Sequence, residues 1–259
     1  MPIRHWADLT TEEFRTRTMG RAIAVLPVAA IEQHGPHLPL ATDTLIAEGY
    51  LAHLAALAPD DLDVLLLPVQ AIGKSDEHDG FPGTLSLTTE TALHAWTGIG
   101  EAVHRAGCAK LVLVTSHGGN SGLIDLVAGH LRGRGMVAVT TSWSRFGYPQ
   151  GLFPEEEIRH GIHGGGIETA LMLALRPDLV RHERIADFTP RSLTMERTFT
   201  HLRAGRPAAF AWKAQDLNPA GAIGDARIGT AEAGARALDH GARAFLELLR
   251  DVDRFQLAG

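Results

Sequence analysis

Glutamate, histidine and aspartate side chains crowd together just after an apolar run near the start of the chain. Residues 31–40 read IEQHGPHLPL, and Asp43 comes three positions later. A folding core does not need this mixture, because charged groups are costly to bury without partners. Carboxylate oxygens and neutral imidazole nitrogens form a mixed ligand set that suits Zn, Mn or Fe. Glu32 and His34 lie two apart, so both face the same way in extended backbone. The stretch therefore predicts part of a metal site, in which a carboxylate such as Asp43 can bridge two ions.

Three later segments contain the same kinds of side chain. The stretch SDEHD holds Ser75 and His78, HGGN begins with His117, and HGGGIE holds His163 and Glu168. A pair of metal ions would polarise a substrate carbonyl and lower the pKa of a bridging water. His163 would then move protons between that water and a leaving nitrogen. If the segments meet in space, they predict a hydrolytic metal centre.

Each of these residues also has an ordinary structural explanation. Asp43 can cap the helix that follows it, and Glu168 in a first helical turn favours the helix dipole. Gly118 and its neighbour permit a tight turn, and a single loop histidine such as His78 is often solvated. None of these structural explanations requires the side chains to lie together. Convergence of the side chains in space would therefore favour a metal site over separate structural roles.

Short apolar runs without polar alternation predict the strands that position these groups. The four runs span residues 22–30, 63–71, 110–116 and 136–142. Strands of this kind are covered on both faces, as in a parallel sheet. Pro27 and Pro68 weaken the strand ends, because proline cannot donate to the ladder.

Segments with apolar residues at helical spacing alternate with these strands. They span residues 44–57, 89–105, 121–131, 168–175 and 231–249. The alternation predicts the α/β class, as a three-layer α/β/α sandwich with a mostly parallel central sheet. Residues 186–228, rich in Thr, Pro and Gly, are left without a predicted structure. No repeat or linker divides the chain, so we expect residues 1–259 to form a single domain.

The polar clusters follow three successive predicted strands. Ligands of open parallel sheets bind beyond the carboxyl ends of the strands, so these clusters are expected at one edge. Trp143 follows the fourth strand at the same edge, with Phe146 and Tyr148 close behind. We expect Trp143 to line a substrate pocket, since such pockets are mostly apolar; packing in the core is the alternative.

Composition excludes several classes of function. The chain has 259 residues, of which 45% are apolar and 21% charged, and a net charge of −6. An acidic chain gives no reason to expect a nucleic-acid partner, and no run of eighteen apolar residues suggests a membrane span. The N-terminus has no apolar segment typical of a secretory signal. The single cysteine, Cys108, agrees with a cytoplasmic location.

Five sequence blocks, in order over roughly residues 20–240, resemble the creatininase (creatinine amidohydrolase) family. The first is LPVAAIEQHGPHLPLATD, and EHDGFPGTLSL, VTSHGGN, HGGGIETALML and PAGAIGDARIGTAEAG follow. The resemblance implies an α/β/α sandwich and two divalent metal ions per subunit. It also implies hydrolysis of a C–N bond in an amide, lactam or formamide, and a homohexamer.

The motifs of the resemblance assign roles to individual residues. The implied metal ligands are Glu32, His34, Asp43 and His117, with Glu168 as a further ligand or catalytic group. His163 matches the proposed acid/base histidine, and the implied substrate contacts are Ser75 and His78. Gly118 is a further candidate for a substrate contact. Creatininase itself carries a tyrosine and a metal-binding glutamate where this chain has Gly118 and Gly119. This departure argues against creatinine as the substrate and is typical of relatives that deformylate formamides or trim a peptide in mycofactocin maturation.

The leading prediction is therefore a metal-dependent amidohydrolase acting on a small molecule, with no nucleic-acid or membrane partner. One alternative is a metallopeptidase that trims a short peptide. The other is a non-catalytic α/β module that binds a small molecule. That module is disfavoured because neither a dinucleotide-binding glycine motif nor a phosphate loop occurs. A serine hydrolase would need G-x-S-x-G, which is also absent.

Overall fold

A parallel five-stranded sheet forms the centre of the protein, for which the computed structural model describes residues 3–57, 59 and 61–257. The strand order is β1–β3–β2–β4–β5, and every neighbouring pair is parallel. The strands are β1 (Arg4–His5), β2 (Ile23–Val28), β3 (Val64–Leu66), β4 (Lys110–Thr115) and β5 (Val137–Ser142). The predicted α/β class with a mostly parallel sheet is confirmed.

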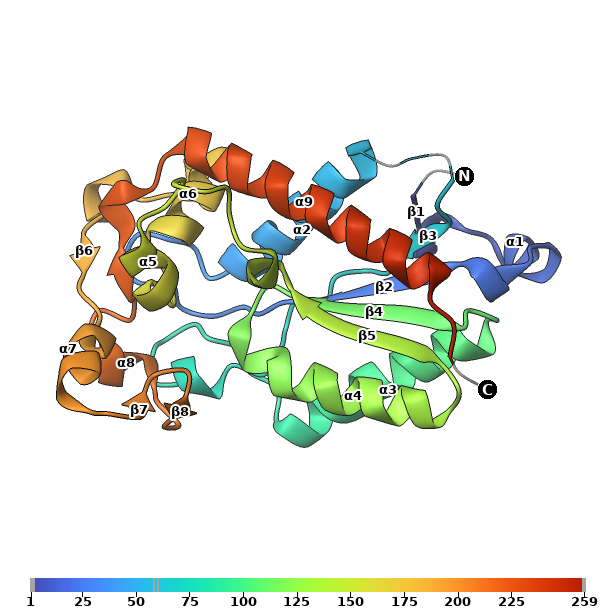
Figure 1. Cartoon of the computed structure of the whole chain (residues 1–259), viewed down its shortest axis with the longest axis horizontal. Helices are drawn as coiled ribbons and strands as arrows, with labels where there is room; N and C mark the ends of the chain where they lie inside the picture. Colours follow the sequence, from blue (N-terminus) through green and yellow to red (C-terminus); the bar gives the residue numbers. More distant parts are fainter. Residues whose placement is uncertain (1–2, 58, 60, 258–259) are drawn as a thin grey trace.

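Long helices cover both faces of this sheet (Figure 1). On one face lie α2 (Thr42–Leu57), α6 (Gly166–Leu175) and α9 (Ala231–Arg254). On the other lie α3 (Thr89–Arg105) and α4 (Ser121–Gly133). The three layers are those that the alternation of strands and helices predicts.

Strand β2 is apolar along its whole length because both of its faces are buried. Ile23 and Val25 of β2 belong to the apolar cluster under α2, α6 and α9. Ala24 and Leu26 of the same strand belong to the cluster under α3 and α4. Successive strand residues point to opposite faces, so a strand between two helical layers needs apolar residues at every position.

Helices α9 and α6 pack closely, and a glycine makes this possible. A Cβ atom at Gly234 of α9 would overlap the backbone carbonyl of Ala170 in α6. The hydroxyl of Thr230 accepts a hydrogen bond from Ala233 N and so caps the start of α9. None of the helices in the described part of the chain, α9 included, has the length and apolarity needed to cross a lipid bilayer.

Shorter elements gather beyond the carboxyl end of the sheet, and most belong to the region that has no predicted structure (Figure 1). The antiparallel pair β6–β9 and the parallel pair β7–β8 lie there. Their bounds are β6 (Asp187–Phe188), β7 (Leu202–Arg203), β8 (Ala208–Ala209) and β9 (Gly224–Asp225). The remaining α-helices are α1 (Thr11–Thr16), α5 (Glu155–His160), α7 (Arg191–Thr198) and α8 (Ala214–Leu217). Helix α1 lies apart from this group, at the opposite end of the molecule.

Single turns of 3₁₀ helix connect many of these elements. They span Trp6–Asp8, Met19–Arg21, Asp76–His78, Gly118–Asn120, Trp143–Phe146, Pro177–Leu179, His182–Arg184 and Ala226–Ile228. The turn Asp76–His78 follows Ser75, a predicted substrate contact, and the turn Gly118–Asn120 follows His117, a predicted metal ligand.

Two of the differences from the predicted element boundaries concern segments beside the predicted site. The strand expected over 63–71 is only β3, Val64–Leu66. The chain stays beside β2 as far as Gln70, which bridges Val28, but Pro68 interrupts the ladder. Helix α2 begins at Thr42, so Asp43 lies in its first turn and is not its cap.

Candidate metal centre

The residues predicted as metal ligands converge beyond the carboxyl ends of the sheet from four separate segments. Glu32 and His34 lie in the loop after β2, and Asp43 lies in the first turn of α2. His117 follows β4, and Glu168 lies in the first turn of α6. The structure thus brings together five side chains that are up to 136 positions apart in the sequence.

The five side chains form two groups of three possible donors that share Asp43. One group is Glu32, Asp43 and His117, and the other is His34, Asp43 and Glu168; within each, the donor atoms lie within 4.8 Å of one another. In the first, His117 Nδ1 is 3.1 Å from Glu32 Oε1 and 3.5 Å from Asp43 Oδ2. In the second, His34 Nε2 is 3.5 Å from Asp43 Oδ1 and 3.7 Å from Glu168 Oε2. Each oxygen of Asp43 therefore faces a different imidazole, as a bridging carboxylate would.

Three atoms of these groups are buried without a hydrogen-bond partner among the described residues. They are Glu32 Oε1, His34 Nε2 and Asp43 Oδ2. Buried polar atoms are nearly always paired, and the side chains of all three residues are at most 2% exposed. All three atoms face the same small region, and all are chemically suited to bind a divalent cation. The residues present therefore fit a metal centre.

Hydrogen bonds on the far side of the ligand residues hold them in place. Glu32 O accepts a hydrogen bond from His34 Nδ1 at 3.0 Å, which leaves His34 Nε2 facing the carboxylates. Ser75 Oγ donates to Glu32 Oε2. Ser75, predicted as a substrate contact, is fully buried behind Glu32, so the contact that the structure shows orients a candidate ligand.

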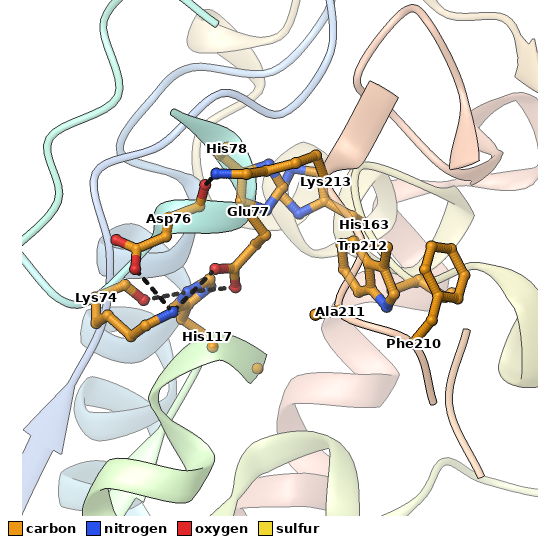
Figure 2. A pocket seen from close by; sticks show the side chains of 13 residues that line it. Lys74, Asp76, Glu77, His78, His117, His163, Phe210, Ala211, Trp212 and Lys213 are labelled. Atoms are coloured by element: carbon orange, nitrogen blue, oxygen red, sulfur yellow. Dashed lines mark hydrogen bonds and ion pairs between the residues drawn. The ribbon is translucent and has the colours of Figure 1, made fainter. Parts of the chain in front are cut away.

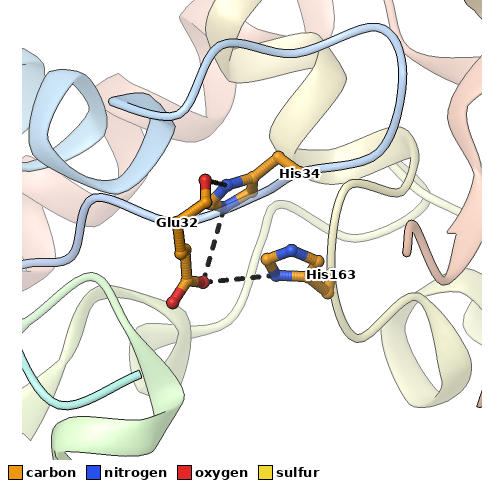
Figure 3. A group of neighbouring side chains, drawn as sticks. All are labelled: Glu32, His34 and His163. Carbon is orange, nitrogen blue, oxygen red and sulfur yellow. Dashed lines mark hydrogen bonds and ion pairs between the residues drawn. The ribbon is translucent and has the colours of Figure 1, made fainter. Parts of the chain in front are cut away.

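His163 lies at the edge of the centre, beside Glu32 and His34 (Figure 3). Its Nδ1 is 3.6 Å from Glu32 Oε1, and its ring centroid is 4.0 Å from that of His34. The other nitrogen, Nε2, donates to the backbone carbonyl of Gln33 at 2.5 Å. Nδ1 is then the nitrogen that is free to accept a proton inside the site. Glu32, His34 and His163 also form a third group of three possible donors.

Burial and the dense charges of the centre shift the pKa values of its residues in opposite directions. Burial disfavours charged His34, but the carboxylates around it, Asp43 first, raise its pKa to about 9. Burial also opposes charge on Glu32, yet His117 and its neighbours hold the pKa of Glu32 well below its usual range. Burial raises the pKa of Glu168 to about 7. Such large shifts are typical of functional sites.

Two histidines beside the candidate ligands, His163 and His78, have lowered pKa values and are therefore neutral at physiological pH. Burial and the nearby His34 hold the pKa of His163 well below its usual range. Burial lowers the pKa of His78 to about 4. Their rings stack with centroids 4.1 Å apart. A neutral imidazole can accept a proton, as the acid/base role predicted for His163 requires.

Gln33 is a site residue that sequence reasoning missed. Its Nε2 lies 2.6 Å from His78 Nδ1 and donates to Gly221 O at 3.0 Å. Its Oε1 accepts from the backbone of Gly35. Gln33 thus ties the loop after β2 to a histidine and to a distant glycine turn. The one available signal was its place between two candidate ligands.

A cavity of about 510 Å³ opens beside the centre (Figure 2). His78 and Gly118, both predicted as substrate contacts, line it together with His117 and His163. Its outer wall comes from the segment without a predicted structure and is formed by Phe210, Ala211, Trp212 and Lys213. Trp212 Nε1 donates to Ala204 O at 2.8 Å, which fixes the orientation of the indole ring.

Trp143, the fourth predicted substrate contact, lies on the other side of His117. It is 3% exposed, and its ring packs against Tyr50 and Phe245 with centroids 4.4 and 4.8 Å away. It also lines a smaller cavity of about 160 Å³ that reaches His117 and Glu168. Trp143 is therefore packed in the core and also lines a cavity beside the centre.

Comparison with known proteins finds one family over nearly the whole chain. The family model described as "Creatininase: Creatinine amidohydrolase" matches residues 7–249. A creatinine amidohydrolase of Pseudomonas putida is 35% identical over 201 residues, covering 71% of this chain and 76% of that protein. A mycofactocin precursor peptide peptidase of Mycobacterium tuberculosis (strain CDC 1551 / Oshkosh) is 34% identical over 220 residues, covering 82% and 78%. A solved structure of a creatininase, named "Creatininase Mn", superposes with a TM-score of 0.77 at 26% identity, covering 97% of this chain and 99% of that one.

Proposed function

Because the chain belongs to the creatininase family of metal-dependent amidohydrolases, we propose that it hydrolyses the C–N bond of a small amide, lactam or formamide. The observation that supports this most is the pair of three-donor groups sharing Asp43. A neutral histidine, His163, stands beside them. The cavity next to these residues is large enough for a small substrate.

Two divalent ions would be held by the donor groups, with Asp43 common to both. Glu32 and His117 complete one set, and His34 and Glu168 complete the other. When bound, such ions supply the Lewis acidity that activates a water molecule and polarises a carbonyl group. The mixed oxygen and nitrogen donors suit Zn, Mn or Fe, and one similar solved structure is named "Creatininase Mn".

His163 is the proposed acid/base group. Its low pKa leaves Nδ1 unprotonated at neutral pH, ready to accept a proton from the attacking water. Nε2 keeps its hydrogen bond to Gln33 O, so the ring does not need to turn during the reaction. The proton held on Nδ1 is then available to the departing nitrogen, which leaves as a neutral amine.

The proposed substrate contacts divide between the two cavities. His78 and Gly118 line the larger cavity, and Trp143 lines the smaller one. Gly118 has no atom within 4 Å of where a Cβ would stand, so this part of the wall leaves room for substrate. Ser75 would act on substrate indirectly, by holding Glu32.

A short peptide is the second candidate substrate. The similarity to a peptide peptidase extends over 82% of this chain, more than the 71% covered by the creatinine amidohydrolase. The wall formed by Phe210 and Trp212 offers apolar contacts to side chains flanking a scissile bond. Trimming of a short peptide uses the same residues in the same roles.

We also propose that residues 1–259 form one domain, and that the protein is a cytoplasmic homohexamer with no nucleic-acid or membrane partner. The absence of a nucleic-acid partner is supported by the net charge of −6.

Hydrolysis assays on a substrate panel test the proposal directly. The purified protein would be loaded with Zn²⁺, Mn²⁺ or Fe²⁺ and offered creatinine, other lactams, N-formyl compounds and short peptides, with release of amine as the readout. We expect turnover of at least one class and loss of that turnover in Asp43→Ala. Turnover by Asp43→Ala at the parent rate would overturn the proposal, as would a parent protein that retains no metal.

A further inference from the structure

The two ring nitrogens of His117 face different surroundings. Nδ1 faces the carboxylates of Glu32 and Asp43. Nε2 lies 3.0 Å from the backbone carbonyl of Lys74 and 3.3 Å from Glu77 Oε1. A carbonyl oxygen can only accept, and a neutral imidazole has one N–H, so that N–H lies on Nε2. Nδ1 is then the nitrogen left to bind a cation.

Glu77 is held firmly against the outer side of this ring. It belongs to the turn Asp76–His78, and its side chain is only 14% exposed. Oε1 faces His117, while Oε2 lies 3.7 Å from Lys74 Nζ. Figure 2 draws the carboxylate interacting with both the lysine and the imidazole. Glu77 is in none of the three donor groups, so its position is behind a ligand and not at the ions.

Gly119 provides the space that this carboxylate occupies. A Cβ atom at position 119 would overlap both Glu77 Oε1 and His117 Nε2. The φ angle of Gly119 lies outside the left-handed region, so the need is for space and not for an unusual backbone. Gly118, one residue earlier, has nothing within 4 Å of a built Cβ. The steric demand is therefore specific to position 119.

We propose that Glu77 is a positioning residue of the metal centre, and that Gly119 lacks a side chain to make room for it. The carboxylate backs His117 Nε2, keeps the ring in the tautomer and orientation that present Nδ1, and strengthens Nδ1 as a donor. Partners behind a ligating histidine act in this way in metal sites generally, and their loss weakens metal binding by about 10- to 100-fold. The inference rests on the proposed function, since it assumes that the centre binds cations.

Titration of chelator-treated protein with Co²⁺ tests the role of Glu77, with the visible absorption band and the dissociation constants as readouts. Glu77→Gln keeps the shape and removes the charge; Asp76→Asn is the matched control, because Asp76 also pairs with Lys74 but does not contact His117. We expect Glu77→Gln to raise the dissociation constant of one of the two Co²⁺ ions by about tenfold or more and to alter the visible absorption band of that ion. Asp76→Asn should bind both ions as tightly as the parent protein does.

A second pair of variants tests the space at position 119. Gly119→Ala should weaken Co²⁺ binding in the same direction as Glu77→Gln, and Gly118→Ala should leave the dissociation constants unchanged. If Glu77→Gln and Gly119→Ala both bind two Co²⁺ ions as tightly as their controls do, the role of Glu77 is refuted. A parent protein that binds no Co²⁺ refutes instead the proposed function from which the inference starts.

Discussion

Replacing Asp43 with asparagine should abolish binding of both ions, whereas loss of any other candidate ligand should affect mainly one. Asp43 is the single residue common to the two donor groups, and each of its oxygens faces a different histidine. Asparagine keeps the size of the side chain but removes its negative charge and one of its two oxygen donors. Glu168→Gln is the natural comparison, because Glu168 belongs to only one of the groups that contain Asp43.

The size of the effect follows from the linkage between metal binding and folding. An ion present at a hundredfold excess over its dissociation constant stabilises the folded state by about 2.7 kcal/mol. In a chain of this length, 1 kcal/mol moves the melting temperature by roughly 2–4 °C. Each ion is therefore worth about 5–10 °C and two ions about twice that. Asp43→Asn should lose the whole metal-induced shift, and Glu168→Gln should keep about half of it.

Melting temperatures with and without added Zn²⁺, together with metal content measured by mass spectrometry, provide the assay. The metal-induced shift is the relevant quantity, since removing a buried charge changes the baseline stability of the metal-free protein. Asp251→Asn is a matched control, because Asp251 is exposed on α9 and pairs with Arg254. A full two-ion shift in Asp43→Asn, or equal residual shifts in Asp43→Asn and Glu168→Gln, would refute the assignment of Asp43 as the shared ligand.

Further predictions concern catalysis, pH and packing. His163→Ala should lower kcat by roughly 10²- to 10⁴-fold with unchanged metal content; parallel loss of metal would instead make His163 a ligand. The pKa of His34 rises from 6.5 to about 9 in the metal-free fold. Its proton therefore stabilises that fold fully below about pH 6.5, and this contribution is lost as pH rises through about 9. The melting temperature of chelator-treated protein should fall more steeply across that pH range than the melting temperature of His34→Gln. Identical pH profiles for the two proteins would contradict this role of His34. Gly234→Ala should cost about 1–3 kcal/mol, since its Cβ would overlap Ala170 O. Gly129→Ala, on an open face of α4, should raise the free energy of unfolding in urea by up to about 1 kcal/mol. If both alanine variants changed the free energy of unfolding in the same direction, the packing argument would be rejected.

The central sheet and its long helices are predictable because their sequence patterns are local and repeated. The helix predicted over 89–105 has the same bounds in the structure. Helix α9 is predicted to end at 249 and continues to Arg254, since amphipathic spacing indicates a helix better than it indicates where the helix ends. The region 186–228 could not be predicted, because its strands have two residues each and β6 pairs with β9, which is distant in the sequence.

The candidate site is predictable in composition but not in detail. Residue types and strand order are enough to expect that Glu32, Asp43 and His117 meet. They do not show that Ser75 turns away to bind Glu32, because a hydroxyl can serve a ligand or a substrate equally well. They also do not identify Gln33, whose partners are distant in the sequence.

The packing of α9 has a consequence for how the protein matures as it is synthesised. This helix lies on α2 and α6, whose first turns hold Asp43 and Glu168, yet it is the last helix of the described chain. Every candidate donor leaves the ribosome well before α9 does, while the apolar faces of α2 and α6 still lack their cover. A chain stopped just short of residue 231 would therefore contain the complete donor set without the support that fixes its spacing. The spacing of Asp43 and Glu168 therefore depends on contacts with a helix that is synthesised after both of them.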